Sequence, residues 1–143
     1  MLWLVFALIS ATLNALMDFF VKLSSNKISD GLGGVLLTAS ATVAMLVPVL
    51  LSKMRGEEML ITKQGAFFSI LAGLSVGMAT FFIFKMFSTR VEMSVAVPTM
   101  RIAIIVVATL LGIFFFHEKI SARLLIGFAC ALSGVYLIIT APR

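Results

Sequence analysis

The sequence predicts an all-α integral membrane protein with five transmembrane helices. Hydrophobic residues make up 62% of the 143 residues, only 12% are charged, and the mean hydropathy is +1.19. A soluble domain of this size leaves about a third of its chain surface exposed, which is too much for so apolar a chain. Five long apolar stretches divide the sequence, and none alternates with the period of two typical of membrane β-barrels. Because unpaired backbone groups are very costly in hydrocarbon, each stretch is expected to be a helix.

The five apolar stretches lie at about residues 2–23, 32–52, 65–87, 94–115 and 122–141. Each can cross a hydrocarbon core of ~30 Å, because a helix rises ~1.5 Å per residue. We expect the first stretch to be a retained helix, because no basic segment precedes its apolar core, as it would in a signal peptide. The spans leave no room for a second domain, so residues 1–143 are predicted to form a single transmembrane domain.

Polar residues interrupt the first stretch at helical spacing. Asn14 lies near its middle, Asp18 one turn further along, and Lys22 one turn beyond that. A charged group at such depth costs about 2.5–3.5 kcal/mol on insertion scales, so it needs a partner or water. Asn14 and Asp18 are therefore candidates for a substrate or coupling site. The alternative is that Asp18 pairs locally with Lys22 at i, i+4.

Polar connections bound the second stretch, and small residues mark the third. Residues 24–34 are turn-like, and residues 52–64 form the longest polar loop. In the third stretch, Gly73 and Gly77 form a small-xxx-small pair, and Phe84 lies further along the same face. This spacing lets helices approach closely in lipid, so the two glycines are predicted to have a structural role. The phenylalanine run of Phe81, Phe82, Phe84 and Phe87 is expected to face mostly lipid. The alternative is a binding role for one or two of these rings, with Phe84 as the candidate substrate contact.

The fourth stretch carries Pro98 and, about two turns inside, Arg101. Arg101 and Asp18 lie ~7 and ~5 residues from the same membrane face, so their depths differ by only ~3 Å. An ion pair between Asp18 and Arg101 across a cavity is therefore geometrically possible. The alternative is that Arg101 extends its head group to the interface. We expect at least one of the two to line a functional cavity.

A very tight connection, His117-Glu118-Lys119-Ile120-Ser121, joins the fourth and fifth stretches, which must then be antiparallel neighbours. Ser121 is a plausible N-cap, and Glu118 is expected to be structural. In the fifth stretch, Gly127 and Gly134 have the spacing of packing residues. His117 beside one carboxylate is too weak a signal for a metal site, so none is predicted.

Several functional classes are disfavoured. The net charge of +5 does not indicate nucleic acid, because the basic residues are scattered at helix ends, as in membrane proteins generally. No Gly-x-Ser-x-Gly, His-Glu-x-x-His, Walker loop or cysteine pair is present. We therefore predict no catalytic residues, no cofactor and no enzymatic activity. The single Cys130 is expected to be a small packing residue.

Loop charges favour neither membrane face. Five spans place Lys53, Arg55, Lys63, Lys119 and Arg123 on one face and Lys22, Lys27, Lys85, Arg90 and Arg143 on the other. The count is five against five, and the eleventh basic residue, Arg101, lies inside a helix. The positive-inside rule then gives no preferred orientation. A chain with this balance could insert both ways and pair with an inverted copy of itself.

The order of motifs indicates a family. The third stretch is rich in glycine and aromatic residues. It is followed, in order, by Ser94-Val95-Ala96-Val97-Pro98, a phenylalanine run, the His117–Ser121 junction and the segment from Gly127 to Val135. In order and spacing, Gly73 to Ile139 resembles the EamA-type half of the drug/metabolite transporter superfamily. The residues from Asn14 to Lys22 fit its polar, Lys-ended first helix loosely. His117 replaces the usual Gly of the junction, and the Trp-Gly-Ser often found in the first helix is missing.

The resemblance implies an architecture and a mechanism. The usual family member has ten helices in two five-helix halves of opposite topology around a central cavity, and it works by alternating access. This chain corresponds to one half. The other half is most simply supplied by a second, inverted copy, which agrees with the charge count and with the general plan of transporters.

We therefore predict a secondary transporter in the bilayer, expected in a prokaryotic cell (inner) membrane. It would export a small polar or amphipathic metabolite as an antiparallel dual-topology homodimer, coupled to protons or down the gradient. Asp18 would be the protonatable or cation-facing group and Arg101 its counter-ion, a combination that slightly favours zwitterions. A flippase for phosphorylated or lipid-linked sugars, favoured by Arg101, is one alternative. A non-transporting partner subunit is the other.

Overall fold

The computed structural model describes residues 1–119 and 121–141, which form helices joined by short connections. The helices are α1 (Leu2–Ser24), α2 (Asp30–Met54), α3 (Lys63–Ser88), α4 (Met93–Phe116) and α5 (Ala122–Thr140). No strand occurs in this described part of the chain, so the predicted all-α class with five helices is confirmed. The predicted bounds differ from these by no more than two residues. Ile120 of the predicted junction and the counted Arg143 lie outside the described residues.

Local side-chain hydrogen bonds fix the starts of two helices. The Thr62 hydroxyl accepts a hydrogen bond from the Gly65 N–H at 3.1 Å, and the Ser121 hydroxyl accepts one from the Leu124 N–H at 3.2 Å. Each bond satisfies one of the backbone donors that the first turn of a helix leaves unpaired. The predicted N-cap at Ser121 is therefore confirmed.

The chain divides into two compact units, Met1–Arg90 and Val91–Arg143. The first unit contains α1, α2 and α3, and the second contains α4 and α5. The prediction of a single domain over residues 1–143 stays a prediction.

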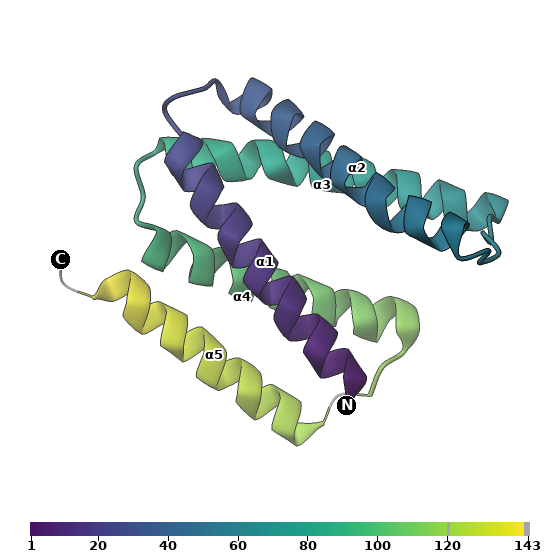
Figure 1. Cartoon of the computed structure of the whole chain (residues 1–143). Helices are drawn as coiled ribbons and strands as arrows, with labels where there is room; N and C mark the ends of the chain where they lie inside the picture. Colours follow the sequence, from purple (N-terminus) through teal and green to yellow (C-terminus); the bar gives the residue numbers. More distant parts are fainter. Residues whose placement is uncertain (120, 142–143) are drawn as a thin grey trace. The chain divides into compact units, whose positions relative to one another are not determined.

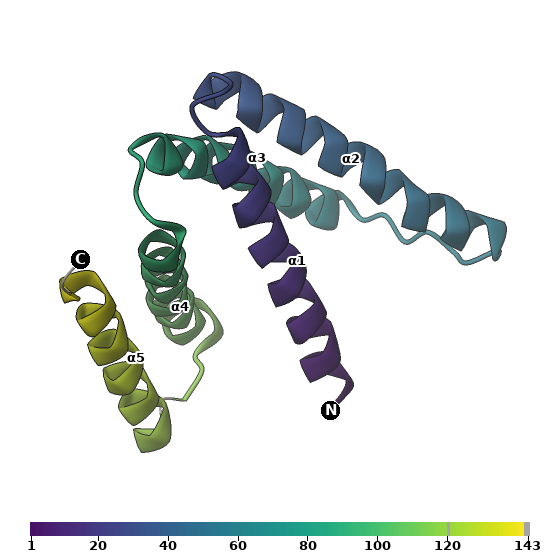
Figure 2. The same ribbon diagram turned by 60° about the vertical axis from the view of Figure 1, so that its left-hand side comes forward.

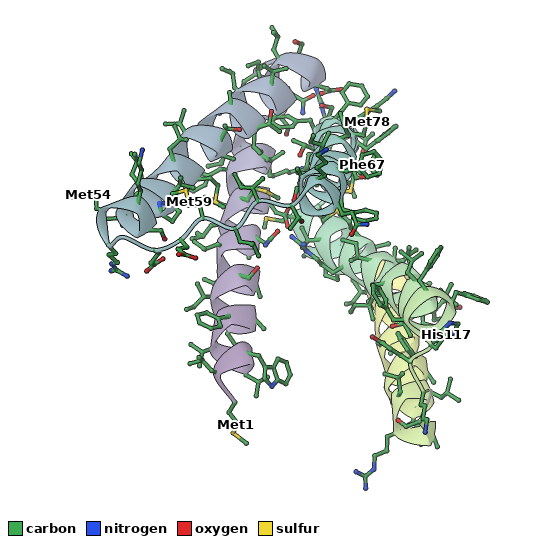
Figure 3. All side chains as sticks on the ribbon, turned by 90° about the vertical axis from the view of Figure 1, so that its right-hand side faces the viewer. Met1, Met54, Met59, Phe67, Met78 and His117 are labelled. Atoms are coloured by element: carbon green, nitrogen blue, oxygen red, sulfur yellow. The ribbon has the colours of Figure 1, made fainter. Side chains whose placement is uncertain are left out.

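In the first unit, α2 and α3 lie side by side and antiparallel, joined by the loop that carries Met59 (Figures 1 and 3). α1 meets α3 near the end of α1 and diverges toward its N-terminus (Figure 2). Accordingly, residues 1–13 are exposed, whereas Asp18 and Val21 are buried. The buried part of this unit thus lies where α1 ends, α2 begins and α3 ends.

In the second unit, α4 and α5 pack against each other as antiparallel neighbours, as the short connection predicts (Figure 1). α4 ends at Phe116, and the next residue, His117 (labelled in Figure 3), adopts a left-handed conformation with φ of 53°. Such a residue commonly ends a helix, and glycine is the usual one because it has no Cβ to clash. The tight turn is therefore made at a position where glycine would be under less strain than histidine.

Apolar side chains cover most of the exposed surface. All five helices are long and apolar enough to cross a membrane, and within the most apolar part of each at most 11% of the residues are buried in the chain. A surface of this kind is stable against lipid, whereas a water-soluble monomer rarely exposes large apolar patches. The chain is an integral, multi-pass membrane protein.

Candidate functional site

The most buried polar residue of the first unit is Asp18 on α1, which is 0% exposed. Thr80 on α3 and Ser25 after α1 are also buried. Asp18 is one of the residues predicted from sequence to line a functional site, and burial of a carboxylate in a membrane helix is costly enough to mark such a site. Its predicted role in binding or coupling stays a prediction.

Lys22 lies one helical turn after Asp18 and reaches across to α3. Its Nζ lies 5.4 Å from the centroid of the Phe87 ring, and that ring is 0% exposed. A cation within about 6 Å of the centroid of an aromatic ring is attracted by the negative face of that ring. A buried carboxylate and a cation over an aromatic ring thus lie on successive turns of α1. The expectation that the phenylalanine run faces mostly lipid is wrong for Phe84 and Phe87, whose burial depends on how α1 and α2 pack against α3.

Two glycines allow α2 to approach α3 closely. A Cβ at Gly33 would lie 2.7 Å from Cζ of Phe84, so the Phe84 ring fills the place where a side chain would be. A Cβ at Gly34 would lie 3.8 Å from the Thr80 methyl. Phe84 is only 3% exposed as a result of its packing, and its predicted contact with substrate stays a prediction. The sequence predicts a turn-like connection over residues 24–34, whereas α2 already begins at Asp30 and includes both glycines.

A side-chain hydrogen bond also joins these two helices. The Ser88 hydroxyl donates to Oδ1 of Asp30 at 2.6 Å, which joins the end of α3 to the start of α2. Asp30 also places a negative charge at the N-terminus of α2, where the helix dipole favours it. The Asp30 carboxylate is therefore held by the dipole of α2 and by the Ser88 hydroxyl, and both contacts are structural.

Asn14 lies on α1, one turn before Asp18, and is partly exposed. Its side-chain amide donates a hydrogen bond to the Ser10 carbonyl at 2.9 Å. In the second unit, Pro98 and Arg101 are also partly exposed on α4. Because Asp18 belongs to the first unit and Arg101 to the second, their ion pair stays a prediction.

The predicted packing glycines differ in their surroundings. A Cβ added at Gly73, Gly77, Gly127 or Gly134 would meet no neighbouring group within 4 Å in the described part of the chain. A Cβ at Gly112 on α4, by contrast, would lie 2.6 Å from Oε2 of Glu118. The Glu118 N–H also donates to the Gly112 carbonyl at 3.3 Å. Glu118 thus folds back over the end of α4, while the structural roles of the other four glycines stay predictions.

The groove between α4 and α5 is apolar. It has a volume of about 240 Å³, and Leu110, Ile113 and Phe128 are among the residues that line it. It offers no charged group to a ligand. The polar residues predicted to form a site lie elsewhere, on α1 of the first unit and at Arg101 on α4.

Comparisons with known proteins agree with these features. Residues 1–140 match the EamA-like transporter family. The uncharacterized transporter YwfM of Bacillus subtilis (strain 168) is 34% identical over 107 residues, which cover 73% of this chain and 36% of that protein. The match therefore spans about a third of the length of that relative. No solved structure matches the chain.

Proposed function

Because this chain belongs to the EamA-like transporter family, we propose that it is a secondary transporter working by alternating access in an antiparallel homodimer. Two inverted copies would enclose a cavity near the middle of the bilayer, as inverted repeats do in many transporters. The substrate is a small polar or amphipathic metabolite, moved outward. Movement is coupled to protons or runs down the substrate gradient.

The equal number of basic residues on the two membrane faces is the observation on which the proposed dimer rests. Five basic residues fall on each face, so neither orientation is favoured during insertion. The glycine pairs Gly73/Gly77 and Gly127/Gly134 support the same proposal, because a Cβ at any of them would meet nothing within 4 Å in the described residues. Small residues at this spacing are common where membrane helices associate.

Asp18 and Arg101 supply the polar chemistry of the proposed cavity. Asp18 is the protonatable or cation-facing group, and Arg101 is its counter-ion or a contact for an anionic part of the substrate. Asn14, Phe84 and Pro98 complete the proposed substrate site. Intramembrane ionisable groups usually face a cavity, which supports this assignment.

Reporter fusions test the dimer directly. Reporters active on only one side of the membrane, fused at each end of the chain, should show both orientations in one culture. Two lysines added to one face should bias insertion and reduce transport, because they deplete one orientation. A single clean orientation would contradict the homodimer and would require a different partner for the second half.

Flux into liposomes tests transport itself. The purified chain alone should move a substrate found by screening metabolite classes for thermal stabilisation. Absence of flux from a well-folded, correctly oriented dimer would favour a non-transporting partner subunit. Movement restricted to phosphorylated or lipid-linked sugars would favour the flippase alternative.

A further inference from the structure

The contact between Lys22 and Phe87 has a feature that simple interfacial anchoring does not explain. An anchoring lysine extends away from the packed helices toward the head groups. Lys27 and Lys85, at the same end of this unit, are exposed as such residues would be. Lys22 instead is partly buried, and its Nζ lies 5.4 Å from the centroid of a ring that is 0% exposed. The ammonium thus lies inside the packed end of the unit, against α3.

Two groups near Lys22, one in contact with its ammonium and one a helical turn away on α1, have the chemistry that recognises a positive charge. The face of the Phe87 ring attracts cations, and it does so more strongly when water is excluded. Asp18, 0% exposed, lies one turn away on the same side of α1 and carries a carboxylate. An aromatic face and a buried carboxylate together would bind any small organic ammonium, whether it belongs to a side chain or to a free molecule.

We infer that the Lys22 ammonium is a built-in competitor for an ammonium site formed by Phe87 and Asp18. The inference rests on the proposed transport function and names its substrate class, which is molecules with an organic ammonium group. Lys22 occupies the site when no substrate is bound, and substrate entry displaces it toward the interface. The flexible four-carbon stem of lysine allows this movement without a change in the helix. Lys22 then determines specificity, because a ligand must bind well enough to displace it.

The first experiment measures binding of n-butylammonium to the full-length chain in detergent by titration calorimetry. Lys22→Met keeps the apolar stem but removes the charge, so the affinity should rise about tenfold. A tethered group competes at an effective concentration in the millimolar range, and its removal abolishes that competition. Lys27→Met, an exposed lysine near the same helix end, is the matched control and should leave the affinity unchanged.

A second change identifies the ring as part of the site. In the Lys22→Met chain, Phe87→Leu should reduce the affinity for n-butylammonium about fivefold, because the aromatic face is lost while an apolar side chain remains. Equal or weaker binding by Lys22→Met would overturn the inference, since Lys22 would then support the site instead of competing for it. An unchanged affinity on Phe87→Leu would exclude the ring.

A measurement on the unaltered chain covers the case in which the variants fail to fold. Acetylation rates of Lys22 and Lys27 are compared with and without tetramethylammonium, which the reagent cannot acylate. Displacement should accelerate the reaction at Lys22 several-fold and leave Lys27 unchanged. If Lys22 is acetylated at the same rate with and without tetramethylammonium, the proposed displacement of Lys22 is contradicted. Because both experiments measure binding without flux, absence of transport in liposomes would refute the proposed function and leave this site intact.

Discussion

The close approach of α2 to α3 gives a sharp quantitative prediction at Gly33. In Gly33→Ala the new Cβ would lie 2.7 Å from Cζ and 2.8 Å from Cδ1 of Phe84. Carbon atoms in ordinary contact are about 3.5–4.0 Å apart, so these atoms must separate by about 0.8 Å or more. Phe84 is 3% exposed, so its ring has little free space into which it can move. The substitution should therefore overpack the contact between the two helices.

The expected cost follows from two opposing effects. Overpacking in a well-packed region costs about 1–3 kcal/mol. Replacing glycine by alanine within a helix gains up to about 1 kcal/mol. Gly31 provides a matched control, because it lies in the same first turns of α2 and a Cβ there would meet nothing within 4 Å. Gly31→Ala should be neutral or slightly stabilising, and the difference between the two variants isolates the overpacking cost.

The assay is reversible unfolding in mixed micelles with increasing SDS, followed by far-ultraviolet ellipticity. Gly33→Ala should unfold with a free energy about 1–3 kcal/mol below that of Gly31→Ala. Adding Phe84→Ala to both variants should remove the difference between them, because the ring that meets the new methyl group at position 33 is gone. The resulting coupling energy should match the overpacking cost. Equal stability of Gly33→Ala and Gly31→Ala would refute the close packing of Gly33 on Phe84.

Three further predictions concern the turn after α4 and the proposed pair of Asp18 and Arg101. His117→Gly should stabilise the turn by about 1 kcal/mol, because a non-glycine residue at φ of 53° is strained; a lower Tm in detergent would instead reveal a stabilising contact of the imidazole. Glu118→Gln should lower the folded yield and leave substrate affinity nearly unchanged, whereas a large loss of affinity with normal yield would place Glu118 in the pathway. Asp18→Asn and Arg101→Gln should each reduce Tm or flux strongly, and the double variant should recover stability but not flux. Additive losses of stability in that cycle would show that the two side chains do not meet.

The five helices could be predicted from the sequence, with bounds within two residues of those in the structure. A membrane-spanning helix is specified by a local property, a run of about 20 apolar residues, because hydrocarbon excludes unpaired backbone groups along the whole run. The N-cap at Ser121 was predictable for a similar reason, since its partner, the Leu124 N–H, is three residues away. The burial cost of Asp18 could also be anticipated, because depth in the bilayer follows from position along the helix.

The tertiary structure alone decided which side chains meet. Gly73 and Gly77 have the spacing of a packing pair, yet a Cβ at either would meet nothing within 4 Å in the described chain, whereas Gly33 and Gly34, in a segment predicted to be turn-like, pack closely against α3. In the same way, only the structure places the Lys22 ammonium over Phe87 on a different helix. Lipid is as apolar as the helix surfaces, so hydrophobicity does not determine which faces associate. Van der Waals fit and the register between helices do, and both depend on residues far apart in the sequence.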